Sequence, residues 1–298
     1  MISQRKNPVV GLVQSSTTSD RQENVDKAVR GIRDAARRGA TLVVLQELFA
    51  SPYFCQVEDA ALFDLAEPIP GPTTNAIAAV AREAKVTVVT SVFERRAAGL
   101  FHNTAVVLGP NGEELSRYRK MHIPDDPQYY EKFYFTPGDL GFVACPTPSA
   151  VVGTLVCWDQ WYPEAARLTA LRGAELLTYP TAIGWLPRDK AEHGAAQLSA
   201  WQTMQRSHAI ANGVFVVAVN RVGVETTGDS EIEFWGRSFV CDPAGVVIAE
   251  AGAGEEVLVV ECDLSKIEAA RRGWPFLRDR RIDVFGDLAR RWIDPKAG

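Results

Sequence analysis

The sequence predicts an α/β fold in which two packed β-sheets carry helices on their outer faces. Short, β-branched apolar segments alternate along the chain with segments whose apolar residues recur at helical spacing. The order of these segments in the first half is repeated in the second half, as expected of two similar halves. Because no linker rich in Pro, Gly, Ser or charged residues separates the halves, we predict a single domain over residues 1–298.

The first half opens with a predicted buried strand at residues 8–14. Apolar residues at helical spacing predict a helix over 22–37, and a second helix is predicted over 73–84 with Thr73 or Thr74 as its N-cap. Residues 120–148 carry no regular period but many prolines and aromatic residues, and a loop of that length is usually functional. Further strands are predicted at residues 41–47, 86–93 and 104–109.

The second half repeats this order, and the repetition extends to short stretches of letters. VVG at 9–11 corresponds to VVG at 151–153, and RGA at 38–40 corresponds to RGA at 172–174. Helices are predicted from Pro163 to about Leu171 and over 195–211. Strands are predicted at residues 151–157, 174–181, 214–220, 235–241, 245–250 and 256–262.

The composition is that of a globular protein. Of 298 residues 46% are hydrophobic, which is enough for a sizeable core, and the net charge of −5 argues against a phosphate-binding surface. No apolar run is long enough to span a membrane, and the run Val9–Val13 is too short for a signal peptide. Five cysteines, an odd number and without a Cys-x-x-Cys spacing, favour free thiols, so we expect a cytoplasmic protein.

Several common motifs are absent from the sequence. There is no glycine-rich dinucleotide or phosphate loop, no G-x-S-x-G elbow and no histidine pair with metal-ligand spacing. The stretch 271–281 combines arginines with Trp274 and Phe276, which fits either a nucleic-acid surface or a tail docked on a protein. We favour the docked tail because the chain is acidic overall.

Cys157 stands apart from the other cysteines because it ends a predicted strand just before a turn into a helix. A thiol there is either a buried packing residue or an exposed nucleophile beside backbone N–H groups. Glu47, which ends an apolar strand, lies either at a surface edge or in a functional site. Lys120 follows another candidate strand, where a lysine is usually solvated.

The stretches VLQELF (44–49), YRKMHIP (118–124) and CWDQWYPE (157–164), in this order, resemble the carbon–nitrogen hydrolase (nitrilase) superfamily, and the resemblance covers nearly the whole chain. Within it, residues 47–56, 122–142, 179–184 and 273–281 are similar to the N-carbamoylputrescine amidases. The resemblance implies a four-layer αββα sandwich made of two similar βα halves. It also implies homo-oligomers built on dimers, with the C-terminal tail (about 271–298) in the contacts.

The resemblance further implies a catalytic triad of Glu47, Lys120 and Cys157, with Glu131 as a second glutamate that positions Lys120 or the substrate. The Lys120 ammonium and the backbone N–H of Trp158 are expected to stabilise an oxyanion. No metal or organic cofactor is implied. The partner that the resemblance implies is a small N-carbamoyl amine, and neither a nucleic acid nor a membrane is expected as a partner.

N-carbamoylputrescine carries an ammonium group, so acidic or aromatic side chains are expected around it. The similar amidases of the polyamine pathway carry an acidic residue soon after this Ala-Ile-Gly, whereas here Trp185-Leu186-Pro187 follows Gly184. A more apolar N-carbamoyl compound, such as an N-carbamoyl amino acid or β-ureidopropionate, is therefore an alternative substrate. Two further alternatives are another enzyme of the superfamily, acting on a dicarboxylate monoamide or a nitrile, and a binding or scaffold protein that keeps the fold without catalysis. The candidate substrate-binding residues are Tyr53, Asp125, Asp126, Tyr129, Tyr130, Trp161 and Thr181.

Overall fold

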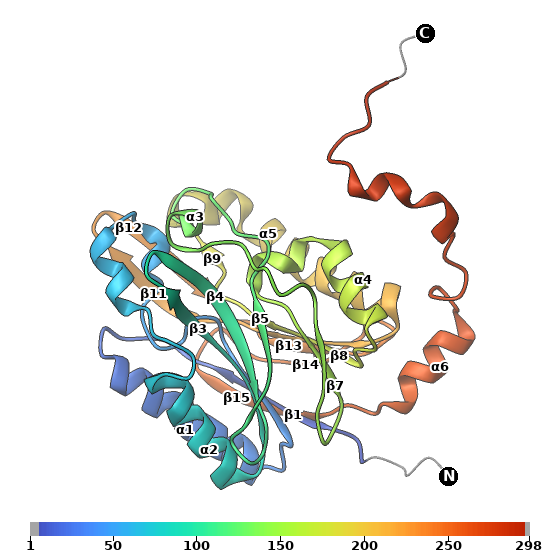
Figure 1. The fold of residues 1–298 in the computed structure, drawn as a ribbon, viewed down its shortest axis with the longest axis horizontal. Helices are drawn as coiled ribbons and strands as arrows, with labels where there is room; N and C mark the ends of the chain where they lie inside the picture. The colour runs from blue at the N-terminus through green and yellow to red at the C-terminus, as the bar shows by residue number, and fades with distance from the viewer. Residues whose placement is uncertain (1–5, 296–298) are drawn as a thin grey trace.

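The structure is a computed structural model that describes residues 6–295. Residues 1–5 and 296–298, which belong to the predicted domain and tail, lie outside the described residues. Two six-stranded sheets form the body (Figure 1). The first has the order β15 (Glu256–Glu261), β1 (Val9–Gln14), β2 (Leu42–Leu45), β3 (Thr87–Ala97), β4 (Leu100–Leu108), β5 (Glu114–Arg119). The second has the order β14 (Val247–Glu250), β13 (Phe239–Cys241), β10 (Phe215–Val219), β8 (Leu176–Pro180), β7 (Val151–Thr154), β6 (Ala144–Pro146).

The two sheets pack face to face, and helices cover both outer faces. Side chains such as Leu12 and Val44 of the first sheet share a buried cluster with Leu176 and Val217 of the second. The helices α1 (Arg21–Arg37) and α2 (Pro72–Ala84) pack on the first sheet, and α4 (Pro163–Leu171) and α5 (Pro187–Asn212) pack on the second. The predicted four-layer αββα sandwich is therefore confirmed.

The internal repeat of the sequence corresponds to a repeat of topology. Each sheet has three parallel strands at its centre, β1, β2 and β3 in the first sheet and β7, β8 and β10 in the second. An antiparallel strand pairs with each side of this parallel group. The matched glycines have the same task in both halves: a Cβ on Gly11 would lie 2.7 Å from Cβ of Ala35 in α1, and one on Gly153 would lie 2.3 Å from Cγ2 of Thr169 in α4. Both glycines therefore allow a helix to approach its strand closely.

Several predicted boundaries are wrong. The N-cap of α2 is Gly71 rather than Thr73 or Thr74, and Thr74 accepts from the Gly71 N–H instead. The strand predicted over 151–157 ends at Thr154. The segment 235–241 is broken because Gly236 and Arg237 have positive φ, so only Phe239–Cys241 forms a strand there.

The structure also contains elements that the sequence patterns did not reveal. Helix α5 begins eight residues before the predicted 195, because its polar first half is largely exposed and shows no apolar period. A third sheet of β11 (Val222–Thr227), β12 (Ser230–Trp235) and β9 (Gly184–Trp185) covers one end of the sandwich. The long loop 120–148 contains the short helix α3 (Glu131–Tyr134) and β6.

The C-terminal segment leaves the body. After β15 comes α6 (Ser265–Gly273). Trp274, Phe276 and Leu277 then line a cavity together with Ile210 and Pro243 of the body. The later part of the segment, with the short 3₁₀ helices η4 (Ile282–Val284) and η5 (Gly286–Ala289), extends away from the sandwich (Figure 1). This segment exposes Trp274, Ile282, Leu288 and Trp292.

Candidate active site

Glu47 lies in a turn at the carboxyl end of β2 and is fully buried. Its Oε1 accepts hydrogen bonds from Asn103 Nδ2 at 2.7 Å and from Lys120 Nζ at 2.9 Å. Its Oε2 is also buried but has no hydrogen-bond partner. The next residue, Leu48, has a φ of +48°, which is unusual for a residue with a branched side chain. One carboxylate oxygen is thus fixed, and the other is free to accept a proton.

Lys120 follows β5 directly and is fully buried, in contrast to the solvated position usual for a lysine. Its Nζ donates to Glu47 and, at 2.6 Å, to Glu131 Oε2 in α3. Burial alone would lower the pKa of Lys120, but the carboxylates of Glu131 and Glu47 outweigh this and raise it well above the usual value. Lys120 is therefore a permanent cation at this site.

Glu131 is the second carboxylate on the lysine, and it is buried as completely as Glu47. Its Oε1 accepts from the Tyr53 hydroxyl at 2.7 Å, so both of its oxygens are occupied. Burial raises the pKa of Glu131, and Lys120 opposes the rise. Its contacts fit a residue that holds Lys120 in place.

Cys157 is the first residue of the 3₁₀ helix η3 (Cys157–Trp161), which leads into α4. Its φ of +40° marks a strained turn, and strain of this kind gathers at functional sites. Burial raises the pKa of the Cys157 thiol, as do the charges of Glu47 and Glu131, while Lys120 lowers it. The thiol is therefore protonated at neutral pH and needs a base to become a nucleophile.

Asp159 holds this turn, and sequence reasoning did not single it out. Its Oδ2 accepts from the Val156 N–H at 3.0 Å and from the Tyr118 hydroxyl at 2.8 Å. Its Oδ1 accepts from the His122 N–H at 3.1 Å and lies 2.7 Å from His122 Nδ1. Asn103, in the middle of β4, was missed as well. In the sequence, both residues could have been found as polar side chains within a run of apolar or aromatic residues.

A cavity of about 390 Å³ opens at Cys157. Trp158, the expected oxyanion donor, lines it, and as the second residue of η3 it belongs to the helix start, where N–H groups lack intrahelical partners. Charged side chains line the cavity as well: Asp126, Glu131, Arg188 and Asp189. The other lining residues are Pro124, Pro127, Tyr129, Trp161, Ala182, Ile183, Gly184, Leu186, Gln197, Ala200 and Trp235.

The candidate substrate-binding residues fall into two groups. Trp161, with Asp126 and Tyr129, lines the cavity. The other four do not line it. Tyr53 is fully buried on Glu131, and Thr181 is buried with its hydroxyl on Gln160 and the Tyr179 carbonyl. Asp125 is exposed with Lys132 Nζ 3.9 Å away, and Tyr130 is the N-cap residue of α3.

The cysteines form no disulfide within the described part of the chain. All five cysteines are free and buried. Within residues 6–295, no group of three or more His, Cys, Asp or Glu side chains is placed to bind a metal ion. In the same residues, no helix has both the length and the apolar character needed to cross a bilayer.

A sandwich of two α/β halves, with the buried pair of Glu47 and Lys120 and with Cys157 at a cavity, is the arrangement expected of hydrolases that act on carbon–nitrogen bonds. The family model described as carbon-nitrogen hydrolase matches residues 9–272. This chain belongs to that family and is an amidase.

Named relatives match most of this chain. An N-carbamoylputrescine amidase of Solanum lycopersicum is 45% identical over 93% of both chains. A citrullinase of Francisella tularensis is 37% identical over 95% of this chain and 98% of its own. The crystal structure of a carbon-nitrogen hydrolase from Helicobacter pylori G27 has a TM-score of 0.94 and 47% identity, covering 97% of this chain and 100% of that one.

Proposed function

We propose that this amidase hydrolyses N-carbamoyl amines, with N-carbamoylputrescine as the substrate, releasing putrescine, carbon dioxide and ammonia. The observation that carries the proposal is the fully buried Lys120 ammonium held between Glu47 and Glu131 next to the Cys157 thiol. Relatives that carry the name N-carbamoylputrescine amidase are 42–45% identical to this chain, which supports the choice of substrate.

The first half-reaction forms a thioester. The free Oε2 of Glu47 takes the thiol proton of Cys157 as general base, and the thiolate attacks the ureido carbonyl. Lysine has three N–H donors, and two are used by Glu47 and Glu131, so the third can stabilise the oxyanion together with the Trp158 N–H. The tetrahedral species collapses as Glu47 returns the proton to the leaving nitrogen, and ammonia departs.

The second half-reaction uses water in place of the thiol. Glu47 takes a proton from water, the hydroxide attacks the thioester carbonyl, and the Cys157 thiolate leaves and regains its proton. The released carbamate decomposes to carbon dioxide and the free amine. These steps draw only on side chains and backbone of this chain, and they require neither a metal nor an organic cofactor.

The lining of the cavity offers charges of both signs. Asp126 and Asp189 line it and suit the ammonium group of carbamoylputrescine. Arg188 also lines it and suits a carboxylate, and this favours a ureido amino acid as the second candidate substrate. Citrulline is such a compound, and the relative named citrullinase supports keeping it as the alternative.

An ammonia-release assay with purified enzyme tests the proposal. The panel contains N-carbamoylputrescine, citrulline, carbamoyl-β-alanine, a carbamoyl-D-amino acid and a plain dicarboxylate monoamide. We expect the highest kcat/KM with N-carbamoylputrescine and no release with Cys157→Ala, whose fold is checked by circular dichroism. Preference for the monoamide would reject the ureido assignment, and turnover by the Cys157→Ala variant would reject the nucleophile.

The protein is also proposed to act as one domain in a homo-oligomer built on dimers. The exposed Trp274, Ile282, Leu288 and Trp292 of the projecting tail support a subunit contact, because monomers rarely expose so many large apolar side chains together. A cytoplasmic location is proposed because an oxidised Cys157 could not attack.

A further inference from the structure

A fully buried arginine near the site has no part in the chemistry above. Arg221 follows β10, and its Nη1 lies 2.7 Å from Oε1 of Glu225 in β11. Their side chains are 0% and 7% exposed, and neither residue lines the cavity around Cys157. Since a buried ion pair adds little net stability compared with apolar residues, the position of this pair calls for another reason.

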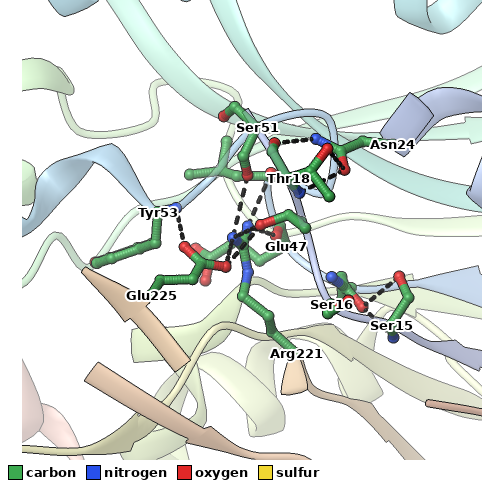
Figure 2. A network of polar contacts seen from close by, with 12 residues as sticks. Ser15, Ser16, Thr18, Asn24, Glu47, Ser51, Tyr53, Arg221 and Glu225 are labelled. Carbon is green, nitrogen blue, oxygen red and sulfur yellow. Dashed lines mark hydrogen bonds and ion pairs between the residues drawn. The ribbon is translucent and has the colours of Figure 1, made fainter. Parts of the chain in front are cut away.

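The guanidinium of Arg221 is bound to the backbone of the turn that carries Glu47. Its Nη2 donates to the carbonyl of Glu47 at 3.0 Å and to that of Leu48 at 2.9 Å. Its Nη1 donates to the carbonyl of Ser51 at 3.1 Å. Figure 2 shows the guanidinium beside this turn, with Glu225 next to it. The planar, forked guanidinium thus fixes three carbonyls of one short segment.

The same turn contains a strained residue. Leu48 has a φ of +48°, a conformation that costs about 1–3 kcal/mol and persists only where the surroundings enforce it. The two carbonyls held by Nη2 belong to the peptide groups on either side of Leu48. Arg221 therefore enforces the backbone conformation that directs the Glu47 side chain toward Lys120 and Asn103.

Glu225 binds the backbone at Tyr53, six residues after Glu47. Its Oε2 accepts from the Tyr53 N–H at 2.5 Å, and the Tyr53 hydroxyl donates to Glu131 at 2.7 Å. The ion pair is therefore linked to both carboxylates that bind Lys120. It reaches Glu47 through the turn, and it reaches Glu131 through Tyr53.

We propose that Arg221, supported by Glu225, is a positioning residue that sets the geometry of Glu47 for the reaction. The inference deepens the proposed function, because it concerns how the proposed general base is held. Misplacing a reacting group by about 1 Å can cost about 100-fold in rate, so the effect is expected in kcat rather than in substrate binding.

The test compares Arg221→Lys and Glu225→Gln with a matched control, Arg38→Lys. Lysine keeps the charge but cannot span three carbonyls, and glutamine keeps the size but removes the charge. Arg38 also donates to a distant backbone carbonyl, that of Val257 at 2.5 Å, but has no contact with the turn. Folding is checked by circular dichroism and thermal unfolding, and kcat and KM are measured with N-carbamoylputrescine. The rate of Cys157 alkylation by iodoacetamide is followed by mass spectrometry.

For folded Arg221→Lys we expect kcat to fall about 10- to 100-fold with KM within about threefold, and alkylation of Cys157 to slow. Arg38→Lys should keep the kcat of the unaltered enzyme. An unchanged kcat, or a rise in KM alone, in folded Arg221→Lys overturns the inference. If that variant does not fold, Glu225→Gln is judged by the same criteria.

The alkylation rate separates this inference from the proposed function. If the unaltered enzyme releases no ammonia from N-carbamoylputrescine, the substrate assignment fails. The effect of Arg221→Lys on Cys157 alkylation then still decides about positioning. An alkylation rate equal to that of the unaltered protein overturns it, and a slower rate supports it.

Discussion

Replacing Lys120 with methionine removes the only cation seen between Glu47 and Glu131 in the described structure and keeps a similar side-chain length. Both carboxylates stay buried, and their oxygens lie 2.9 and 2.6 Å from the same Nζ, so they are at most about 5.5 Å apart. At an effective dielectric constant of about 20, two negative charges at that distance repel by at least about 3 kcal/mol. We therefore expect the carboxylate pair of Lys120→Met to retain a proton at neutral pH.

The retained proton makes the loss of stability depend on pH. An unfolded glutamate titrates near pH 4.3, and a repulsion of about 3 kcal/mol raises the pKa of the folded pair by about two units. A carboxylate whose folded pKa is raised contributes stability at low pH and loses it as the pH rises through the folded pKa. The difference in unfolding free energy between the unaltered protein and Lys120→Met should therefore grow by about 2 kcal/mol from pH 5 to pH 8.

Equilibrium unfolding in urea at pH 5, 6.5 and 8, at one protein concentration, measures this difference. Lys266→Met is a suitable control, because its partner Asp242 lies at 3.0 Å but the lysine side chain is half exposed. That variant should lose less than about 1 kcal/mol. A destabilisation of Lys120→Met that is the same at pH 5 and pH 8 would refute the view that Lys120 compensates two buried charges.

Three further predictions concern other parts of the molecule. Tyr53→Phe removes one hydrogen bond to the Glu131 carboxylate and should lower the unfolding free energy in urea by about 1.5–3 kcal/mol, and a loss below about 0.5 kcal/mol would contradict the contact. Burial opposes ionisation of Glu94, but its hydrogen bonds to Arg119 outweigh burial and lower its pKa, so Glu94→Gln should destabilise the protein at pH 7 by about 3 kcal/mol. The stability that a carboxylate with a lowered pKa contributes is lost as the pH falls through its folded pKa, so the difference in unfolding free energy between the unaltered protein and Glu94→Gln should decrease toward acid pH. A difference that stays constant with pH would contradict the view that the Glu94 carboxylate is ionised in the folded protein. Ending the chain after residue 273 should lower the number of subunits per assembly, calculated from the mass measured by light scattering. An unchanged number of subunits would exclude the tail as a subunit contact.

Local patterns were enough to find the strands before Glu47 and Lys120 and the helix after Cys157, but not the short helix α3 that carries Glu131. Helix α4 begins at Pro163 and ends at Leu171 as predicted, because proline suits the first turn of a helix. The turn at Cys157 was expected from an apolar strand followed by that helix. The turn actually begins three residues after β7 ends, since the strand stops at Thr154. Strand and helix boundaries depend on φ and ψ values that the letters leave open.

Contacts between distant segments could not be read from such patterns. Arg221 reaches the carbonyl of Glu47 across 174 residues of sequence, and Asn103 reaches the side chain of Glu47 across 56. Tyr53 was expected at the substrate but is buried on Glu131 instead. Which of several neighbouring tyrosines faces the cavity depends on how two loops pack, and no local period records that.

The sequence by itself determined the alternation of strands and helices, the repeat of two halves and the family motifs that contain Glu47, Lys120 and Cys157. Burial patterns and turn chemistry are local, so neighbouring residues encode them. Only the tertiary structure decided that Lys120 is a fully buried cation shared by two carboxylates and that Glu47 keeps one oxygen free. Electrostatic and hydrogen-bond energies depend on distances of a few ångströms between the interacting groups. These groups come from loops after different strands, so the tertiary structure sets the distances between them.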